Sequence, residues 1–250
     1  MIRKFGVSAA AALAVCAFSG AALAQVPANI AAAVASPTRP AEDTARDAVR
    51  KPGQILAFAG VKSGDTVVDF IMGGGYFTRL LSGAVGPTGT VYAYQPAEFI
   101  KFQAKYGDSL KAVAALPNVK PLDGPLIGLD LPEGLDLVMT VQNYHDMHLK
   151  AFPTGLASAV DAEIFKSLKP GGVFLVIDHA AVDDSGLTAP DILHRIDAEA
   201  VKAEVEAAGF KLEAESPLLR DAADPHTASV FDPSIRGKTD QFILKFRKPK

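Results

Sequence analysis

The chain has 250 residues, of which 49% are hydrophobic and 21% are charged, a composition typical of one globular domain and not of a disordered chain. Its formal net charge is −3, so it lacks the excess of basic residues with which proteins bind nucleic acid, and we expect no nucleic-acid partner. Cys16 is the one cysteine, which excludes a disulfide within the chain.

Residues 1–24 have the features of a secretory signal peptide. A basic start is followed by an apolar run over 7–18, and Ala22-Leu23-Ala24 supplies the small-x-small pattern that precedes cleavage at Gln25. The apolar run is shorter than the roughly 20 residues that span a bilayer. We therefore expect a periplasmic or secreted protein with no stable membrane association after cleavage. A lipid anchor at Cys16 is the rival interpretation, but the residue before it is not small.

Residues 25–40 are rich in Ala and Pro and read as a flexible leader, so that a single domain would occupy 41–250. Residues 42–49 form a short predicted helix. A second predicted helix, 54–59, ends at Gly60 and leads by a turn into the first strand, so it is a candidate lid.

The chain is organised around the strand over 66–68, which ends in Asp69. Three glycines, Gly73-Gly74-Gly75, follow, and a helix begins near Tyr76. Glycine has no Cβ, so it permits both a tight turn and the close approach of a ligand to the backbone. The pattern indicates a site for a nucleotide-like cofactor. A tight turn without a ligand is the alternative.

After this turn, strands and helices alternate. The predicted strands cover 90–94, 119–122, 135–141, 173–177, 210–215 and 240–246, and the predicted helices cover 97–116, 156–168 and 198–208. Pro121 places its strand at a sheet edge, and 169–172 reads as a sharp turn. This order predicts an α/β fold with a doubly wound, mostly parallel seven-stranded sheet and right-handed crossovers.

Polar residues stand where these strands end. They are Asp69, Gln95, Asp123, the cluster 142–146 and Asp178-His179. In doubly wound sheets, ligands bind beyond the carboxyl ends of the strands, near the point where the strand order reverses. Five polar turns at one edge of the sheet therefore predict a binding site there.

Over roughly 54–246 the chain resembles the class I S-adenosylmethionine-dependent methyltransferases. Their first strand ends in an acid that is followed by glycines at +2, +4 and +6, and here Asp69 is followed by Ile71, Gly73 and Gly75. The segment Leu168-Lys169-Pro170-Gly171-Gly172 is similar to the family's Leu-x-Pro-Gly-Gly. The chain looks most like an exported branch that carries Gly-x-Gly-Tyr and Tyr-His-Asp.

The resemblance implies a Rossmann-like methyltransferase fold with an antiparallel last strand. It also implies an enzyme that binds S-adenosylmethionine as cofactor and methylates an unidentified, small-molecule acceptor. The cofactor-binding residues that it implies are Asp69, Gly73, Gly74, Gly75, Tyr76, Gln95, Asp123 and Asn143. Two positions depart from the family: Ile71 replaces a glycine, and Gln95 stands where an acid normally binds the ribose hydroxyls.

The expected catalytic residues are Tyr144, His145 and Asp146, which follow the fourth strand, where the transferred methyl group would point. His145 titrates near neutral pH, and Asp146 can orient it or act itself. A second pair, Asp178-His179, stands at the end of the neighbouring strand. The alternative is that these residues cap helices and satisfy loop backbone.

Other functions have weaker support. His145, Asp146, His148, Asp178 and His179 can supply metal ligands, but no flanking Glu of a zinc-protease motif is present, and we expect no metal. We interpret His194 and His226 as loop or surface residues. A dehydrogenase would need a third glycine, where Thr78 stands. An exported, non-catalytic small-molecule-binding protein on the same scaffold is the main alternative.

Overall fold

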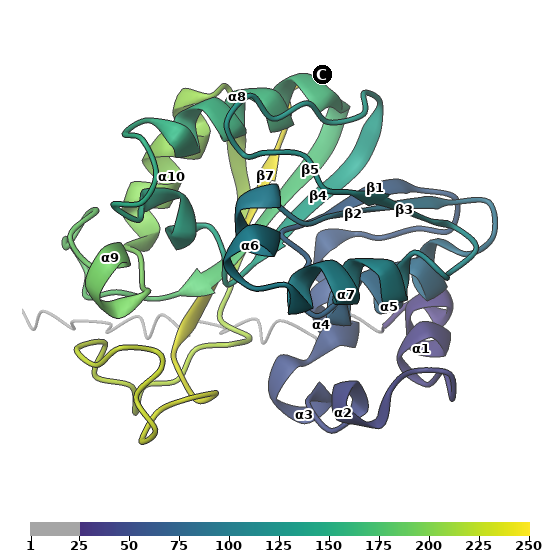
Figure 1. Ribbon diagram of the computed structural model, residues 1–250, viewed down its shortest axis with the longest axis horizontal. Coiled ribbons are helices and arrows are strands. Elements are labelled where there is room, and N and C mark those ends of the chain that lie inside the picture. Colours follow the sequence, from purple (N-terminus) through teal and green to yellow (C-terminus); the bar gives the residue numbers. More distant parts are fainter. Residues whose placement is uncertain (1–25) are drawn as a thin grey trace, which may run out of the picture.

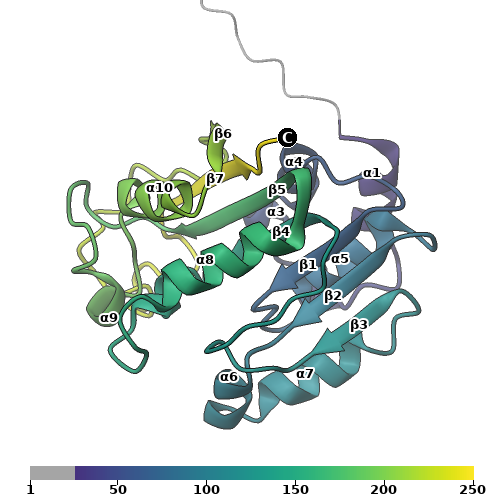
Figure 2. The same cartoon turned by 90° about the horizontal axis from the view of Figure 1, so that it is seen from above.

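The computed structural model describes residues 26–250, and the predicted signal peptide with Cys16 lies outside them. These residues contain one seven-stranded sheet with the order β3-β2-β1-β4-β5-β7-β6 (Figure 2). Its strands are β1 (Thr66–Phe70), β2 (Thr90–Tyr94), β3 (Val119–Leu122), β4 (Leu135–Val141), β5 (Leu168–His179), β6 (Lys211–Ser216) and β7 (Gln241–Arg247). The expected α/β fold with a doubly wound, mostly parallel sheet is confirmed.

The directions of the strands follow the prediction. β1 to β5 pair in parallel, and β7 pairs antiparallel with both β5 and β6. β3 lies at one edge of the sheet, where Pro121 costs no ladder hydrogen bond to a further strand. The strand order reverses between β1 and β4, so the carboxyl ends of these two strands flank the switch point at which doubly wound folds bind ligands.

Helices cover both faces of the sheet (Figure 1). They are α1 (Ala28–Val34), α2 (Ala41–Thr44), α3 (Asp47–Arg50), α4 (Pro52–Ala59), α5 (Tyr76–Val85), α6 (Ala97–Phe102), α7 (Lys105–Val113), the 3-10 helix η1 (His145–His148), α8 (Leu156–Ser167), α9 (Pro190–Leu193) and α10 (Ala198–Ala207). α1, α4, α5 and α7 pack on one face, and α8 and α10 pack on the other.

Successive residues of a strand enter the cores on opposite faces, since side chains alternate along a strand. In β1, Val67 packs under α5 and Val68 packs under α8, and both side chains are fully buried. Apolar residues therefore occupy both faces of β1, β4 and β5, as expected for a sheet that is covered on both sides.

Several elements differ from the sequence prediction, among them the helix predicted over 42–49, which is divided into α2 and α3. The expected flexible leader contains α1, whose Ile30 is fully buried and whose Asn29 Nδ2 donates to Ala84 O of α5 at 2.9 Å. The predicted helix over 97–116 is divided into α6 and α7. The predicted turn over 169–172 lies within β5, because Leu168 already pairs with Leu135 ahead of a register shift.

Two segments lie beyond the carboxyl ends of the strands. One of them contains α2 and α3 and precedes β1 in the chain. Its Arg50 Nη2 donates at 3.3 Å to Oε1 of Gln142, the residue that follows β4. The segment 217–239 approaches from between β6 and β7, where His179 Nδ1 at the end of β5 lies 2.7 Å from Thr239 Oγ1. Among residues 26–250, no helix has the length and the apolar character needed to cross a membrane.

Candidate functional site

The glycine turn after β1 lies in left-handed backbone conformations. Gly73 has φ +57° and Gly75 has φ +79°, and Gly75 is the N-cap of α5. A Cβ atom on Gly75 would lie 2.5 Å from Val113 Cγ1, so neither its conformation nor its surroundings admit a side chain. Ile71, two residues after Asp69, also has a positive φ, of +60°. The turn therefore follows a glycine-like path at Ile71 as well.

Two buried polar side chains, Asp69 and Gln95, stabilise the turn and the start of α5. The Asp69 carboxylate accepts a hydrogen bond from Thr78 Oγ1 at 2.6 Å, and burial raises the pKa of Asp69 to about 6. Gln95 Oε1 accepts from the backbone N of Gly73 at 2.9 Å. The amide nitrogen of Gln95 is buried and has no hydrogen-bond partner among the described residues. Gln95 thus supports the glycine turn through its amide oxygen.

α2 and α3 close over the same turn through the Tyr76 ring. Tyr76 Oη donates to Asp47 Oδ1 at 2.6 Å, and burial with this acceptor raises the pKa of Tyr76. The guanidinium carbons of Arg39, Arg46 and Arg50 lie 5.5, 5.7 and 4.7 Å from the centre of the ring. These distances are within cation–π range. The predicted lid was α4, but α2 and α3 make the cover.

A cavity of about 250 Å³ lies between this cover and the glycine turn. Among the residues expected to bind a cofactor, those that line it are Asp69, Gly73, Gly74, Tyr76 and Asn143. Arg46 and Arg50 line it as well. Burial lowers the pKa of Arg50 to about 10, which leaves the guanidinium charged near neutral pH. The cavity is thus lined by two carboxylates, Asp43 and Asp69, and by two cations.

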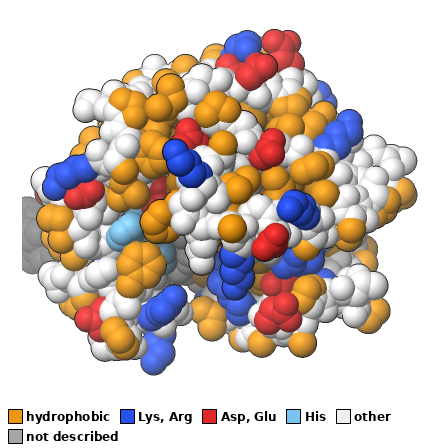
Figure 3. Space-filling view, in the orientation of Figure 1, with side chains coloured by type: hydrophobic (Ala, Val, Ile, Leu, Met, Phe, Trp, Pro, Cys, Tyr) orange, Lys and Arg blue, Asp and Glu red, His pale blue; other side chains and the backbone are white. Residues whose placement is uncertain are grey.

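A second cavity of about 370 Å³ adjoins the first. Both cavities are lined by Arg46, Arg50, Phe77, Val141 and Gln142. Gln142 lies between two partners, since it accepts from Arg50 and donates through Nε2 to Gln241 Oε1 at 3.0 Å. The second cavity is further lined by His179 and Arg236. On the face drawn in Figure 3, Lys, Arg and His side chains lie among acidic and apolar ones.

The two predicted His/Asp pairs meet each other. His145 Nδ1 lies 2.9 Å from Asp178 Oδ1, and His145 Nε2 lies 3.3 Å from Asp146 Oδ1. Burial disfavours the charged ring, but the two carboxylates outweigh it and raise the pKa of His145 to about 10. Neither His145 nor Asp146 lines the two cavities. His179 lines the second cavity, and burial lowers its pKa to about 4, so its ring is neutral at neutral pH.

Tyr144 points away from the cavities, which corrects its expected catalytic role. Its side chain is fully buried, and its hydroxyl donates to Asp161 Oδ2 of α8 at 2.7 Å. Burial raises the pKa of Asp161 to about 8, so this carboxyl is largely protonated near neutral pH. A hydroxyl enclosed beneath α8 cannot contact a ligand in either cavity. Tyr144 is therefore part of the core.

Asp123 is also apart from the glycine turn. It is exposed after β3 and lines a separate hollow between α7 and β3 with Asp108 and Pro121. Asn143 lines the smaller cavity, but its side-chain nitrogen donates to two carbonyls, Ile71 O at 3.0 Å and Val141 O at 2.7 Å. Asn143 thus fixes the turn at Ile71, the residue with a positive φ.

Sequence reasoning did not identify three residues of this region: Arg46, Arg50 and His194. Arg46 lies in the short helix predicted over 42–49, and Arg50 directly follows it. His194 has its ring at the cluster around His145, where its Nδ1 lies 3.3 Å from His145 Nε2. These residues come from short helices without a strong periodic pattern, so only their contacts reveal them.

No protein-family model matches the chain. A SAM-dependent methyltransferase from Aquifex aeolicus is similar in structure, with a TM-score of 0.57 and 21% identity over 81% of this chain and 92% of that chain. The [4+2]-cyclase SpnF aligns with a TM-score of 0.57 and 19% identity over 84% and 81% of the two chains. A possible exported protein from Bordetella parapertussis aligns with a TM-score of 0.53 and 15% identity, over 82% of this chain and 67% of that chain. The chain therefore has the Rossmann-like fold of the class I methyltransferases.

Proposed function

We propose that the protein binds S-adenosylmethionine and transfers its methyl group to a small-molecule acceptor. The observation that carries the proposal is the smaller cavity, where Asp69, the glycine turn and Arg50 meet at the switch point of the sheet. The fold shared with a SAM-dependent methyltransferase supports it. The cyclase on the same fold means that the reaction must be argued from the site itself.

The charges of the smaller cavity suit this cofactor. Its amino-acid end carries an ammonium and a carboxylate, for which the Asp69 carboxylate and the Arg50 guanidinium supply one opposite charge each. Gly73 and Gly74 offer backbone without side chains on the same wall. Gln95 is fully buried and does not line the cavity, so it acts through the glycine turn, where it accepts from the backbone N of Gly73.

Bound cofactor would supply an electrophilic methyl group on a sulfonium, and the protein need only position the acceptor and exclude water. α3 would limit the access of water, since its Asp47 holds Tyr76 over the turn. Arg50 and Gln142 line both cavities, so they border the space through which the two ligands would meet. His179 is the imidazole that faces the larger cavity, and it is the candidate to receive a proton from the acceptor.

The larger cavity favours an acceptor with an anionic group. Arg46, Arg50 and Arg236 line it, whereas no Asp or Glu is among its lining residues. Guanidinium groups bind carboxylates and phosphates through paired hydrogen bonds. We therefore expect a small acid, and mass spectrometry of ligands that copurify under native conditions would identify it.

Calorimetric titration of the protein with S-adenosylmethionine and S-adenosylhomocysteine tests the cofactor. Gly74→Val is the variant of choice, because a Cβ on Gly74 meets no protein atom within 4 Å while Gly74 lines the cavity. Gly124→Val is the matched control, since a Cβ there is equally free and Gly124 lines neither cavity. We expect the wild type and the control to bind, and the dissociation constant of Gly74→Val to rise by about 100-fold, or about 2.7 kcal/mol.

Two outcomes would contradict the proposal. Absence of heat and of a thermal shift at millimolar ligand in the wild type would favour the non-catalytic binding protein. Unchanged affinity in Gly74→Val would place the cofactor at another site. If neither outcome is observed, formation of S-adenosylhomocysteine in the presence of the copurified acid would establish turnover.

A further inference from the structure

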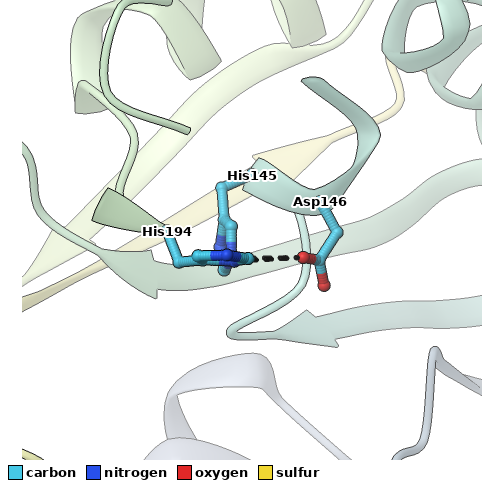
Figure 4. Close-up of side chains that lie close together, drawn as sticks. All are labelled: His145, Asp146 and His194. Atoms are coloured by element: carbon cyan, nitrogen blue, oxygen red, sulfur yellow. Dashed lines mark hydrogen bonds and ion pairs between the residues drawn. The ribbon is translucent and has the colours of Figure 1, made fainter. Parts of the chain in front are cut away.

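Three side chains converge at the carboxyl ends of β4 and β5: His145 and Asp146 from η1, and His194 from the end of α9 (Figure 4). His145 Nε2 lies 3.3 Å from Asp146 Oδ1 and 3.3 Å from His194 Nδ1. The third side of the triangle, from His194 Nδ1 to Asp146 Oδ1, measures 3.8 Å. Two imidazole nitrogens and one carboxylate oxygen thus face a common point.

These spacings match the coordination sphere of a small transition-metal ion. Zinc lies about 2.0–2.1 Å from nitrogen and oxygen ligands, so the ligand atoms of a tetrahedral site are about 3.3 Å apart. Two of the three spacings have this value, and the third closes to it with a shift of about half an ångström. Nitrogen ligands exclude Mg²⁺ and Ca²⁺, which prefer oxygen.

The ligand atoms are held in place by neighbours. Asp178 accepts from the backbone N of His145 at 2.8 Å and contacts ring Nδ1 at 2.9 Å, which turns Nε2 toward the other two side chains. A carboxylate on the remote nitrogen is the usual support of a metal-binding histidine. His194 has φ +53° at the end of α9, and its ring packs edge-on against Phe231 with centroids 4.7 Å apart.

We propose that His145 Nε2, Asp146 Oδ1 and His194 Nδ1 form a binding site for one divalent first-row transition metal ion, with Zn²⁺ as the reference case. The site is reachable from solvent, since the His194 and Asp146 side chains are 26% and 14% exposed. Three protein ligands leave one position open, as in catalytic rather than structural zinc sites. The ring of His145 lies 6.1 Å from that of His179, which lines the larger cavity.

The proposal departs from the expectation of no metal, and it does not depend on the cofactor. The sequence offered His145 and His148 as a pair, but His148 Nε2 lies 2.9 Å from Glu204 Oε2 of α10 instead. The partner is His194, which is 49 residues away along the chain. The competing account is that a shared proton joins the two rings and the carboxylate, without an ion.

Calorimetry on tag-free, chelator-treated full-length protein separates the two accounts. Titration with ZnCl₂ should give one ion per chain, and CoCl₂ should give the visible absorption of a low-coordinate cobalt site. His194→Ala removes one ligand from a partly exposed position and should weaken Zn²⁺ binding by at least about 100-fold, since loss of a mere supporting residue costs 10–100-fold. His226→Ala is the control, because His226 pairs with Asp240 outside the cluster.

The proposal would be overturned if the wild-type protein did not bind one Zn²⁺ per chain. It would also be overturned if His194→Ala bound Zn²⁺ as tightly as the wild type. Circular dichroism would check that each variant folds. Should His194→Ala fail to fold, Asp146→Asn decides, because it preserves the shape of the side chain and removes the anionic oxygen. Unchanged Zn²⁺ affinity in folded Asp146→Asn would equally refute the site.

Discussion

Ile71 is a β-branched residue in the left-handed region of the backbone, inside the turn on which the candidate site is built. This conformation costs a residue with a Cβ atom about 1–2 kcal/mol of conformational energy. β-branched residues rarely adopt it. Two contacts hold the conformation. The Ile71 side chain is 3% exposed within the core under α8, and its carbonyl accepts from Asn143. Packing on one side and a hydrogen bond on the other therefore replace the freedom of a glycine.

The variant Ile71→Gly compares these two effects. Loss of a buried Ile side chain costs about 2–5 kcal/mol, more than the 1–2 kcal/mol of strain that glycine relieves. We expect the free energy of unfolding to fall by about 1–3 kcal/mol in urea denaturation. Ile127→Gly, at a 57% exposed position, should change it by no more than about 0.5 kcal/mol. A more stable Ile71→Gly would mean that strain outweighs packing.

Asp69 should make cofactor affinity depend on pH. Burial raises its pKa to about 6, so the carboxylate that faces the ammonium of the proposed cofactor becomes neutral as the pH falls through this value. Affinity should therefore be constant above pH 7 and about tenfold weaker at pH 5, since the ligand selects the deprotonated form. Calorimetric titrations between pH 5 and pH 8 would measure this change in cofactor affinity. Asp69→Asn should bind weakly without this dependence, and a flat wild-type profile would assign the ammonium to another group.

At the scale of elements, a buried ion pair fixes the segment 217–239. Arg195 is fully buried, and its Nη1 lies 2.8 Å from Asp224 Oδ2 and donates to Ala180 O at 2.8 Å. Its Nε donates to Ala228 O at 2.9 Å. One guanidinium thus joins the end of β5 to a segment with no regular secondary structure. That segment contributes Phe231 and Arg236 to the larger cavity.

Loss of one partner should release this segment. Asp224→Ala leaves the Arg195 charge buried without a counter-ion, which costs about 3–5 kcal/mol. Arg220→Ala breaks an ion pair on the same segment in which Arg220 is 50% exposed, and such pairs contribute about 0–1 kcal/mol. We expect Asp224→Ala alone to lower the unfolding midpoint strongly and to expose 217–239 to proteases. Equal midpoints in the two variants would contradict this assignment.

The sequence predicted the elements with regular patterns and not those that close the site. β1, β2 and β4 are continuous β-branched or apolar runs, and glycines mark the ends of α4 and α10, so their places follow from local preferences. α2, α3 and α9 have four residues each, too few for a periodic signal. Their placement depends on tertiary contacts such as Arg50 with Gln142 and His194 with His145. The polar residues at the strand ends could be predicted from the sequence. The residues of the short helices that contact them could not.

At the scale of the whole molecule, we propose that the chain is exported and cleaved before Gln25. This cleavage would leave α1 in the mature protein, together with Ile30, whose side chain is fully buried against α4 and α5. Expressed with its leader in a Gram-negative bacterium, the protein should appear in the periplasmic fraction with an intact mass that starts at Gln25. Ala24→Arg should retain the leader. A cytoplasmic, uncleaved wild type would refute export.

The position of β7 bears on when the domain can fold. β7 follows β6 along the chain, yet it lies between β5 and β6 in the sheet and pairs with both. Until Gln241–Arg247 have left the ribosome, β6 has no neighbour and the edge of β5 is open. Such late, non-local pairing slows folding. A nascent chain would thus keep this part of the sheet unpaired until β7 has been synthesised, which favours its acceptance by a translocation channel that threads extended polypeptide.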